Sequence, residues 1–154
     1  MPVSYCLYWK SNIADVVLDQ VELSIQCPQP ELVAYLQKHD ILPQAYSPLG
    51  GTDGQKLREN PAVVKIAEKH GVHGATILIS WLIKRGICVL PKSVTPSRIE
   101  ANAKSKLFYF SLETKLTISA VDLAEEEFQS IEELARSTPQ NRVCDQSDSK
   151  SPRV

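Results

Sequence analysis

Two cations and a hydroxyl group, Lys92, Ser93 and Arg98, lie close together in the sequence and could bind an anion. A lysine supplies a compact point charge, and an arginine supplies a planar fork of donors that fits two oxygens of one phosphate. These residue types predict a phosphate-binding site. A corner with two solvated surface cations explains them equally well, and their types alone do not decide between the two.

The residues around this cluster predict a strand that leads directly into a helix. Ile87 to Leu90 form an apolar run typical of a buried strand, and Pro91 ends it because proline has no N–H for a sheet ladder. Thr95 suits an N-cap, and Pro96 suits the first helical turn, where an N–H is not needed. A helix N-terminus adds free N–H groups and partial positive charge, which favour a bound phosphate.

The segment at 91–102, PKSVTPSRIEAN, resembles the phosphate-binding segment of the aldo-keto reductase family, PKS-x-x-x-x-RI-x-x-N. Three further stretches resemble that family in the same order, namely DQVE at 19–22, AYSPLG at 45–50 and ATILISWLIKRGICVL at 75–90. The resemblance extends over 11–134, and four ordered motifs make it specific.

The resemblance implies an α/β fold, the C-terminal half of a (β/α)8 TIM barrel with parallel strands and helices outside. It also implies an NADP(H)-dependent oxidoreductase that reduces a small aldehyde or ketone by hydride transfer. A complete barrel needs about 250 residues, whereas this chain has 154. The expectation is therefore a truncated reductase. The alternative is a non-catalytic half-barrel that binds nucleotide or a partner chain.

The resemblance implies roles for residues at the nicotinamide end of the cofactor. Tyr46 would stack on the nicotinamide ring, and Gln20 would hydrogen-bond its carboxamide. Ser47 and Leu49 would contact the pyrophosphate and ribose. A flat aromatic face suits a flat ring, so the residue types agree with these roles.

At the adenosine end, the resemblance implies that Lys92, Ser93 and Arg98 hold the 2′-phosphate and that Asn102 faces the adenine. The chain departs from the family pattern beside Asn102, where Ala101 replaces the usual glutamate. Glu100 lies one residue earlier, rotated by about 100° on a helix, and misses the adenine. Gly51 likewise stands where the family often has serine. Both departures indicate looser holding of the same cofactor.

The family's acid–base residues, a Tyr, Lys, Asp and His, lie on its first four strands, whereas this chain resembles the family from about the fifth or sixth. The lysine lowers the pKa of the tyrosine so that it can deliver a proton near neutral pH. Tyr5, Tyr8 and Lys10 are not in the matching context, so no catalytic residue is assigned. An incomplete barrel would leave open sheet edges, which favour self-association.

Residues 1–18 form an N-terminal segment that is hard to interpret. Ser11 and Asn12 resemble the family's SNF strand end, but only seven residues separate Asn12 from Gln20. A crossover helix between parallel strands needs a dozen or more residues. Either a helix has been lost here or the match arises by chance.

The remaining pattern predicts parallel strands at 19–24, 42–46 and 87–91, and helices at 31–38, 61–70, 75–84 and from Asp122 onward. Asn60 is the expected cap of the second helix, and Asp122 with Glu125 forms an expected capping box. The glycine-rich turn at 48–54 is either a lid over the cofactor or a plain loop.

Domain boundaries follow from the resemblance and the composition. Residues 19–142 are the expected half-barrel, and an insertion that interrupts the family pattern is expected near 113–120. Residues 143–154 are polar and lack aromatic side chains, which predicts a disordered tail.

Composition excludes several function classes. The net charge of −1 gives no electrostatic reason for binding nucleic acid, and no apolar run approaches the length of a membrane span. Four well-separated cysteines and no signal peptide predict reduced thiols in a cytoplasmic protein. His39, His70 and His73 are expected to be surface residues, and no metal site is predicted.

Overall fold

The computed structural model describes residues 17–51, 54–92, 94–97 and 121–143. Its strands β1 (Leu18–Glu22), β2 (Leu42–Tyr46) and β3 (Cys88–Val89) form one sheet in the order β1-β2-β3, and both pairs are parallel. The parallel arrangement of the three expected strands is confirmed. The middle strand has the expected bounds, whereas the first and third strands end two residues earlier than expected.

The early end of β1 has a local cause. Ser24 and Cys27 form an antiparallel bridge with mutual backbone hydrogen bonds of 3.2 and 3.1 Å. This bridge turns the chain away from the sheet two residues after Glu22. Strand β3 pairs with β2 over two residues, after which the Leu90 N–H still bonds to the Ala45 carbonyl.

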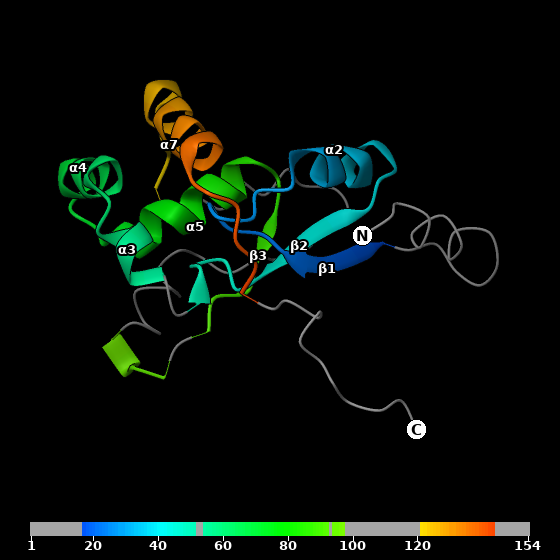
Figure 1. Ribbon diagram of the computed structural model, residues 1–154, viewed down its shortest axis with the longest axis horizontal. Helices are drawn as coiled ribbons and strands as arrows, with labels where there is room; N and C mark the ends of the chain where they lie inside the picture. The colour runs from blue at the N-terminus through cyan, green and yellow to red at the C-terminus, as the bar shows by residue number, and fades with distance from the viewer. Residues whose placement is uncertain (1–16, 52–53, 93, 98–120, 144–154) are drawn as a thin grey trace.

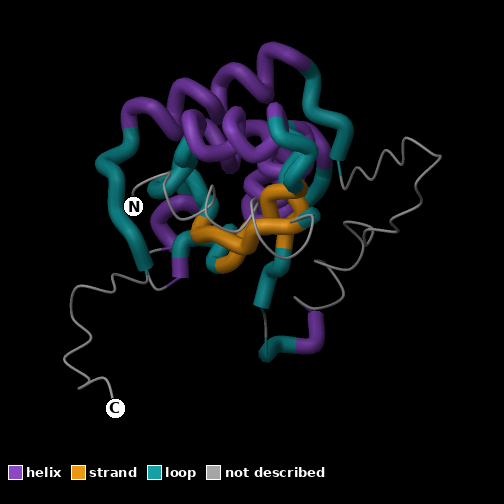
Figure 2. The backbone as a smooth tube through the Cα atoms, turned by 90° about the vertical axis from the view of Figure 1, so that its right-hand side faces the viewer, coloured by secondary structure: helices purple, strands orange, loops and turns teal. Residues whose placement is uncertain are grey.

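The helices form a layer on one face of this sheet, as the two views in Figures 1 and 2 agree. In chain order they are α2 (Pro30–Lys38), α3 (Gly54–Arg58), α4 (Pro61–His70), α5 (Gly74–Lys84) and α7 (Glu125–Ser137). Helix α2 connects β1 to β2, and α3, α4 and α5 lie between β2 and β3. Parallel strands need such crossovers.

The alternation of side chains along β2 separates the two faces of the sheet. Pro43 and Ala45 are buried toward the helices, whereas Leu42, Gln44 and Tyr46 point to the other face and are half-buried. This follows from the two-residue period of a strand. Under the helices, the core is built around large side chains with no exposed surface, among them Leu23, Trp81, Leu82 and Ile131.

Helix α4 begins and ends where its sequence requires. The Asn60 side chain accepts a hydrogen bond of 3.0 Å from the Ala62 N–H, and Pro61 occupies the first turn. Gly71 ends the helix with φ of +63°, a conformation that favours glycine. The expected cap and stop are confirmed.

The short helix α3 was not expected, and it begins at Gly54, the last residue of the glycine-rich turn. One local expectation was wrong. The capping box at Asp122 and Glu125 does not form, because the N-cap of α7 is Ala124, and Glu127 accepts its N–H at 2.9 Å. Several neighbouring acidic residues could have capped this helix, so the sequence allowed more than one start for α7. Packing against the rest of the fold selected the later start.

Glu127 also anchors the start of α7 to the end of α4. Its carboxylate accepts hydrogen bonds from Lys69 Nζ at 2.6 Å and contacts His70 Nε2 at 2.9 Å. The bond from Lys69, the contact with His70 and the Ala124 N–H lower the pKa of Glu127 to about 2. The expectation that His70 is a solvated surface histidine was wrong, because α7 covers it.

The middle of α7 binds the C-terminal end of α5 through Glu132. Its Oε1 accepts a hydrogen bond of 3.0 Å from Trp81 Nε1 and lies 3.4 Å from Arg85 Nε. The Arg85 guanidinium stacks over the Trp81 ring at 4.8 Å and donates to the Pro28 carbonyl at 3.0 Å. Burial lowers the pKa of Arg85, and the charge of Glu132 opposes that shift.

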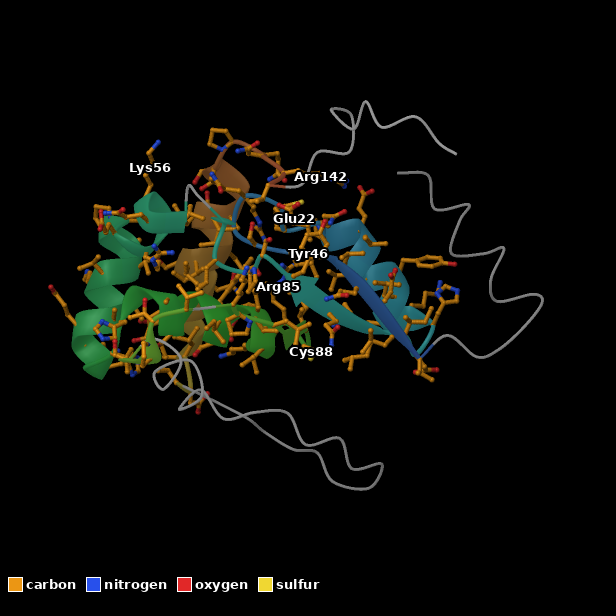
Figure 3. All side chains as sticks on the ribbon, turned by 90° about the horizontal axis from the view of Figure 1, so that it is seen from below. Glu22, Tyr46, Lys56, Arg85, Cys88 and Arg142 are labelled. Atoms are coloured by element: carbon orange, nitrogen blue, oxygen red, sulfur yellow. The ribbon has the colours of Figure 1, made fainter. Side chains whose placement is uncertain are left out.

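After α7 the chain returns to the end of β1. The Asn141 N–H bonds to the Gln26 carbonyl at 2.9 Å, and the Val143 N–H bonds to the Glu22 carboxylate at 2.6 Å. Figure 3 shows Arg142 beside Glu22 at this closure. Burial and the charge of Glu22 raise the pKa of the nearby Cys27 thiol, although Arg142 acts in the opposite direction.

Among the described residues, no helix is both long and apolar enough to cross a membrane. The described ranges also contain no group of three histidine, cysteine or carboxylate side chains arranged to hold a metal ion.

Candidate functional site

Gln20 and Tyr46 lie on the same face of the sheet, away from the helix layer. Gln20 pairs with Gln44, and Glu22 pairs with Tyr46, so the alternate residues of β1 and β2 share one face. Tyr46 is half-buried, whereas Gln20 is exposed. A planar ring and an amide on neighbouring strands can together contact one flat polar group.

Directly after Tyr46 the chain turns into a cavity of about 730 Å³. Four segments line it: the turn after β2, the end of α3, the start of α5 and the stretch after β3. The described lining residues are Ser47, Pro48, Leu49, Gly51, Arg58, His73, Gly74, Ala75, Thr76, Leu90, Pro91, Lys92 and Ser97. The cavity thus lies at the carboxyl ends of the strands, where ligands bind in parallel α/β proteins.

The charges at this cavity have one sign. Arg58 and Lys92 line it, and no aspartate or glutamate is among its described lining residues. Neither cation forms an ion pair with a carboxylate within the described part of the chain. Such a cavity favours an anion.

The N-terminus of α5 faces the same cavity. His73 occupies the N-cap position without a side-chain capping bond, and the Thr76 N–H bonds to the His73 carbonyl at 2.9 Å. The N–H groups of Gly74 and Ala75 therefore have no side-chain cap. A helix start of this kind adds partial positive charge to the cavity.

Close backbone contacts hold the cavity wall together. A Cβ atom at Gly74 would lie 2.3 Å from the Arg58 carbonyl oxygen, so only glycine lets the end of α3 approach the start of α5. Ser47 adopts φ of +50°, the left-handed region, and thereby turns the chain from β2 into the cavity.

Four of the eight expected cofactor residues lie at the cavity or lead into it, and a fifth lies on the neighbouring sheet face. Tyr46 leads into the cavity, and Ser47, Leu49 and Lys92 line it, whereas Gln20 lies on β1, on the sheet face that it shares with Tyr46. The remaining three residues, Ser93, Arg98 and Asn102, lie outside the described residues.

The expected strand–loop–helix corner is present in its described part. Pro91 follows β3, and the helical conformation begins at Pro96, as expected from its fixed φ. The N-terminal residues Ser11 and Asn12 and the suspected insertion at 113–120 also fall outside the described residues.

From the sequence, neither Arg58 nor the N-terminus of α5 was predicted to belong to the site. Arg58 belongs to no motif, and its signal was only a cation placed shortly after a glycine-rich turn. His73 was treated as a surface histidine, and it is exposed, but it also lines the cavity. Only the three-dimensional contact between α3 and α5 reveals these residues.

Comparison with known proteins agrees with this geometry. A family model described as "Aldo/keto reductase family" matches residues 3–135. Glycerol 2-dehydrogenase (NADP(+)) of Hypocrea jecorina is 38% identical over 124 residues, covering 77% of this chain and 34% of that protein. Human aldo-keto reductase family 1 member A1 is 39% identical over 110 residues, covering 67% of this chain and 34% of that protein. The chain thus spans about a third of the length of these relatives.

Solved structures give the same result. An aldo-keto reductase from a deep-sea metagenome library superposes with a TM-score of 0.78 at 28% identity, covering 99% of this chain and 51% of that one. An aldo-keto reductase complexed with NADPH superposes with a TM-score of 0.68 at 26% identity, covering 91% of this chain and 41% of that one.

Proposed function

Because the chain belongs to the aldo-keto reductase family, we propose that it binds NADP(H) across the carboxyl ends of its strands. The fold expectation is confirmed, since the open parallel sheet with its helix layer is part of the family's (β/α)8 barrel. The observation that carries the proposal is the cationic cavity that joins the turn after β2 to the segment after β3.

The cofactor would extend from the strand face into this cavity. Tyr46 and Gln20 contact the nicotinamide, and Ser47 and Leu49 contact the ribose and pyrophosphate. Lys92, Ser93 and Arg98 hold the 2′-phosphate, and Asn102 faces the adenine. Two observations support this path: Gln20 and Tyr46 share one face of the sheet, and Ser47, Leu49 and Lys92 line one cavity.

The central test replaces Arg98 with alanine and titrates NADP+ and NAD+ by calorimetry. A hydrogen bond between charged groups contributes roughly 1.5–3 kcal/mol, so NADP+ affinity should fall by about one to two decades. NAD+ lacks the 2′-phosphate and should be unaffected. Arg136→Ala is the matched control, because Arg136 is exposed on α7 and does not line the cavity.

Two outcomes would contradict this assignment. Equal losses for NADP+ and NAD+ would mean that Arg98 supports only the fold. An undiminished preference for NADP+ would place the 2′-phosphate elsewhere.

We further propose that this chain alone does not carry out the family's reduction of small aldehydes and ketones. The sequence offers no match to the acid–base set of Tyr, Lys, Asp and His, and without a proton donor the alkoxide formed by hydride transfer is not stabilised. Purified chain mixed with NADPH and a simple aldehyde should show no turnover. Turnover that disappears in Tyr5→Phe or Tyr8→Phe would overturn this view.

A specific observation favours the alternative in which the chain also binds a partner. Within the described residues, nothing pairs with the outer edges of β1 and β3, and open strand edges favour pairing with another chain. We therefore expect concentration-dependent association in sedimentation velocity. A monomer at every concentration would argue against it.

A further inference from the structure

The cavity contains one cation, Arg58, for which the family motifs supply no role. It ends the short helix α3, is half-buried and lines the cavity together with Lys92, which follows β3. No ion pair or side-chain hydrogen bond engages its guanidinium within the described ranges. A half-exposed guanidinium without a carboxylate partner has donors available for an anion.

The position of Arg58 is fixed by two close contacts. Its carbonyl oxygen lies against Gly74 at the start of α5. Its Nη1 lies 2.9 Å from the point where a Cβ of Gly54 would stand, and the Leu49 carbonyl oxygen lies 1.9 Å from that point. The guanidinium therefore lies beside the turn after β2, the segment proposed to contact the pyrophosphate.

We infer that Arg58 is a phosphate contact for the pyrophosphate bridge of the dinucleotide, separate from the residues that hold the 2′-phosphate. This inference rests on the proposed cofactor site and deepens it. The planar guanidinium can donate two parallel hydrogen bonds to one phosphate group. The bridge is common to NADP and NAD, so Arg58 contributes to affinity and not to the choice between them.

The experiment measures binding of NADP+, NAD+ and inorganic pyrophosphate to the full chain and to Arg58→Gln and Arg58→Lys. Glutamine keeps much of the side-chain length and removes the charge, so the wall of the cavity is maintained. Arg58→Gln should weaken NADP+ and NAD+ alike by about ten- to a hundredfold. Arg58→Lys should recover part of the loss, and Arg136→Ala should match the wild type.

Ionic strength separates binding from a structural effect. Added salt screens charge attraction, so wild-type affinity should fall with salt more steeply than that of Arg58→Gln. A variant that lost affinity through misfolding would show an altered circular dichroism spectrum and no rescue by lysine.

The possible failures are distinguishable. If Arg98→Ala loses NADP+ selectively while Arg58→Gln binds normally, the cofactor site stands and the role of Arg58 is wrong. If neither dinucleotide binds but pyrophosphate binds and depends on Arg58, the role of Arg58 as a phosphate contact stands and the cofactor proposal is wrong. If a folded Arg58→Gln loses only NADP+, Arg58 belongs to the 2′-phosphate site, which overturns the inference. If pyrophosphate binds neither the wild type nor Arg58→Gln, the inference about Arg58 is overturned as well.

Discussion

The two ends of helix α5 use cations in opposite ways. At its C-terminal end, Lys84 lies 3.6 Å from Glu125 and Arg85 lies 3.4 Å from Glu132, so each cation is matched by a carboxylate of α7. At its N-terminal end, Arg58 and Lys92 line a cavity with no acidic residue among its described lining. In Figure 1, α7 lies above α5.

This difference shows how a structural cluster of charges can be told from a binding site. Cations that dock one helix on another are paired within the protein, and their contribution is to stability. Cations at a cavity without partners add little to stability but provide free energy for binding an anion. Substitutions at the two ends should therefore separate unfolding from binding.

The largest effect is expected at Trp81, the fully buried residue of the paired end. Trp81→Ala would leave a cavity in the core and remove the hydrogen bond to Glu132, which should lower the free energy of unfolding by about 3–5 kcal/mol. Urea unfolding followed by circular dichroism measures it. A loss below about 1 kcal/mol would mean that α7 is not firmly docked.

Glu127 should give a smaller effect with a defined pH dependence. Its folded pKa is lowered from 4.5 to about 2, so its stabilisation is complete above about pH 4.5 and disappears as pH falls toward 2. Lys69 is mostly exposed, which weakens that ion pair. Glu127→Gln should thus cost only about 0.5–1.5 kcal/mol at pH 7.

The measurement is thermal or urea unfolding of Glu127→Gln and wild type between pH 7 and 2. The difference between the two proteins should stay constant above about pH 4.5 and close toward pH 2. A difference that is the same at pH 2.5 and pH 7 would show that the carboxylate does not stabilise the fold through its charge.

The smallest effect on stability is expected at the cavity. Arg58→Gln and Lys92→Ala should change the free energy of unfolding by less than about 0.5 kcal/mol, because neither cation has a carboxylate partner in the described part of the chain. The same urea titration serves as the assay. Losses comparable to that of Trp81→Ala would remove the distinction between the two ends.

Much of the fold could be predicted from the sequence because the pattern was local. The cap at Asn60 and the stop at Gly71 each depend on a few neighbouring residues and lie where expected, and strand β3 lies within the apolar run that ends at Pro91. The start of α7 was harder to predict. Several acidic residues near 122–127 could cap it, and contacts with Lys69 and His70 decided which one does.

The candidate site was predictable where it coincides with motifs. Ser47, Leu49 and Lys92 were expected at the cofactor and do line one cavity. Arg58 was not, because its location depends on the contact of its carbonyl with Gly74, sixteen residues away in the sequence. Spacing in the sequence contains no information about such a contact.

The bond between Val143 and Glu22 determines when this fold is completed. It joins residues that are 121 positions apart, whereas Leu18 and Leu42, which pair β1 with β2, are only 24 apart by subtraction. Closing a longer loop costs more chain entropy, and contacts distant in sequence slow folding. This hydrogen bond is therefore expected to form last during folding and to break first during unfolding. Hydrogen exchange at the Val143 amide then reports the earliest loss of native structure.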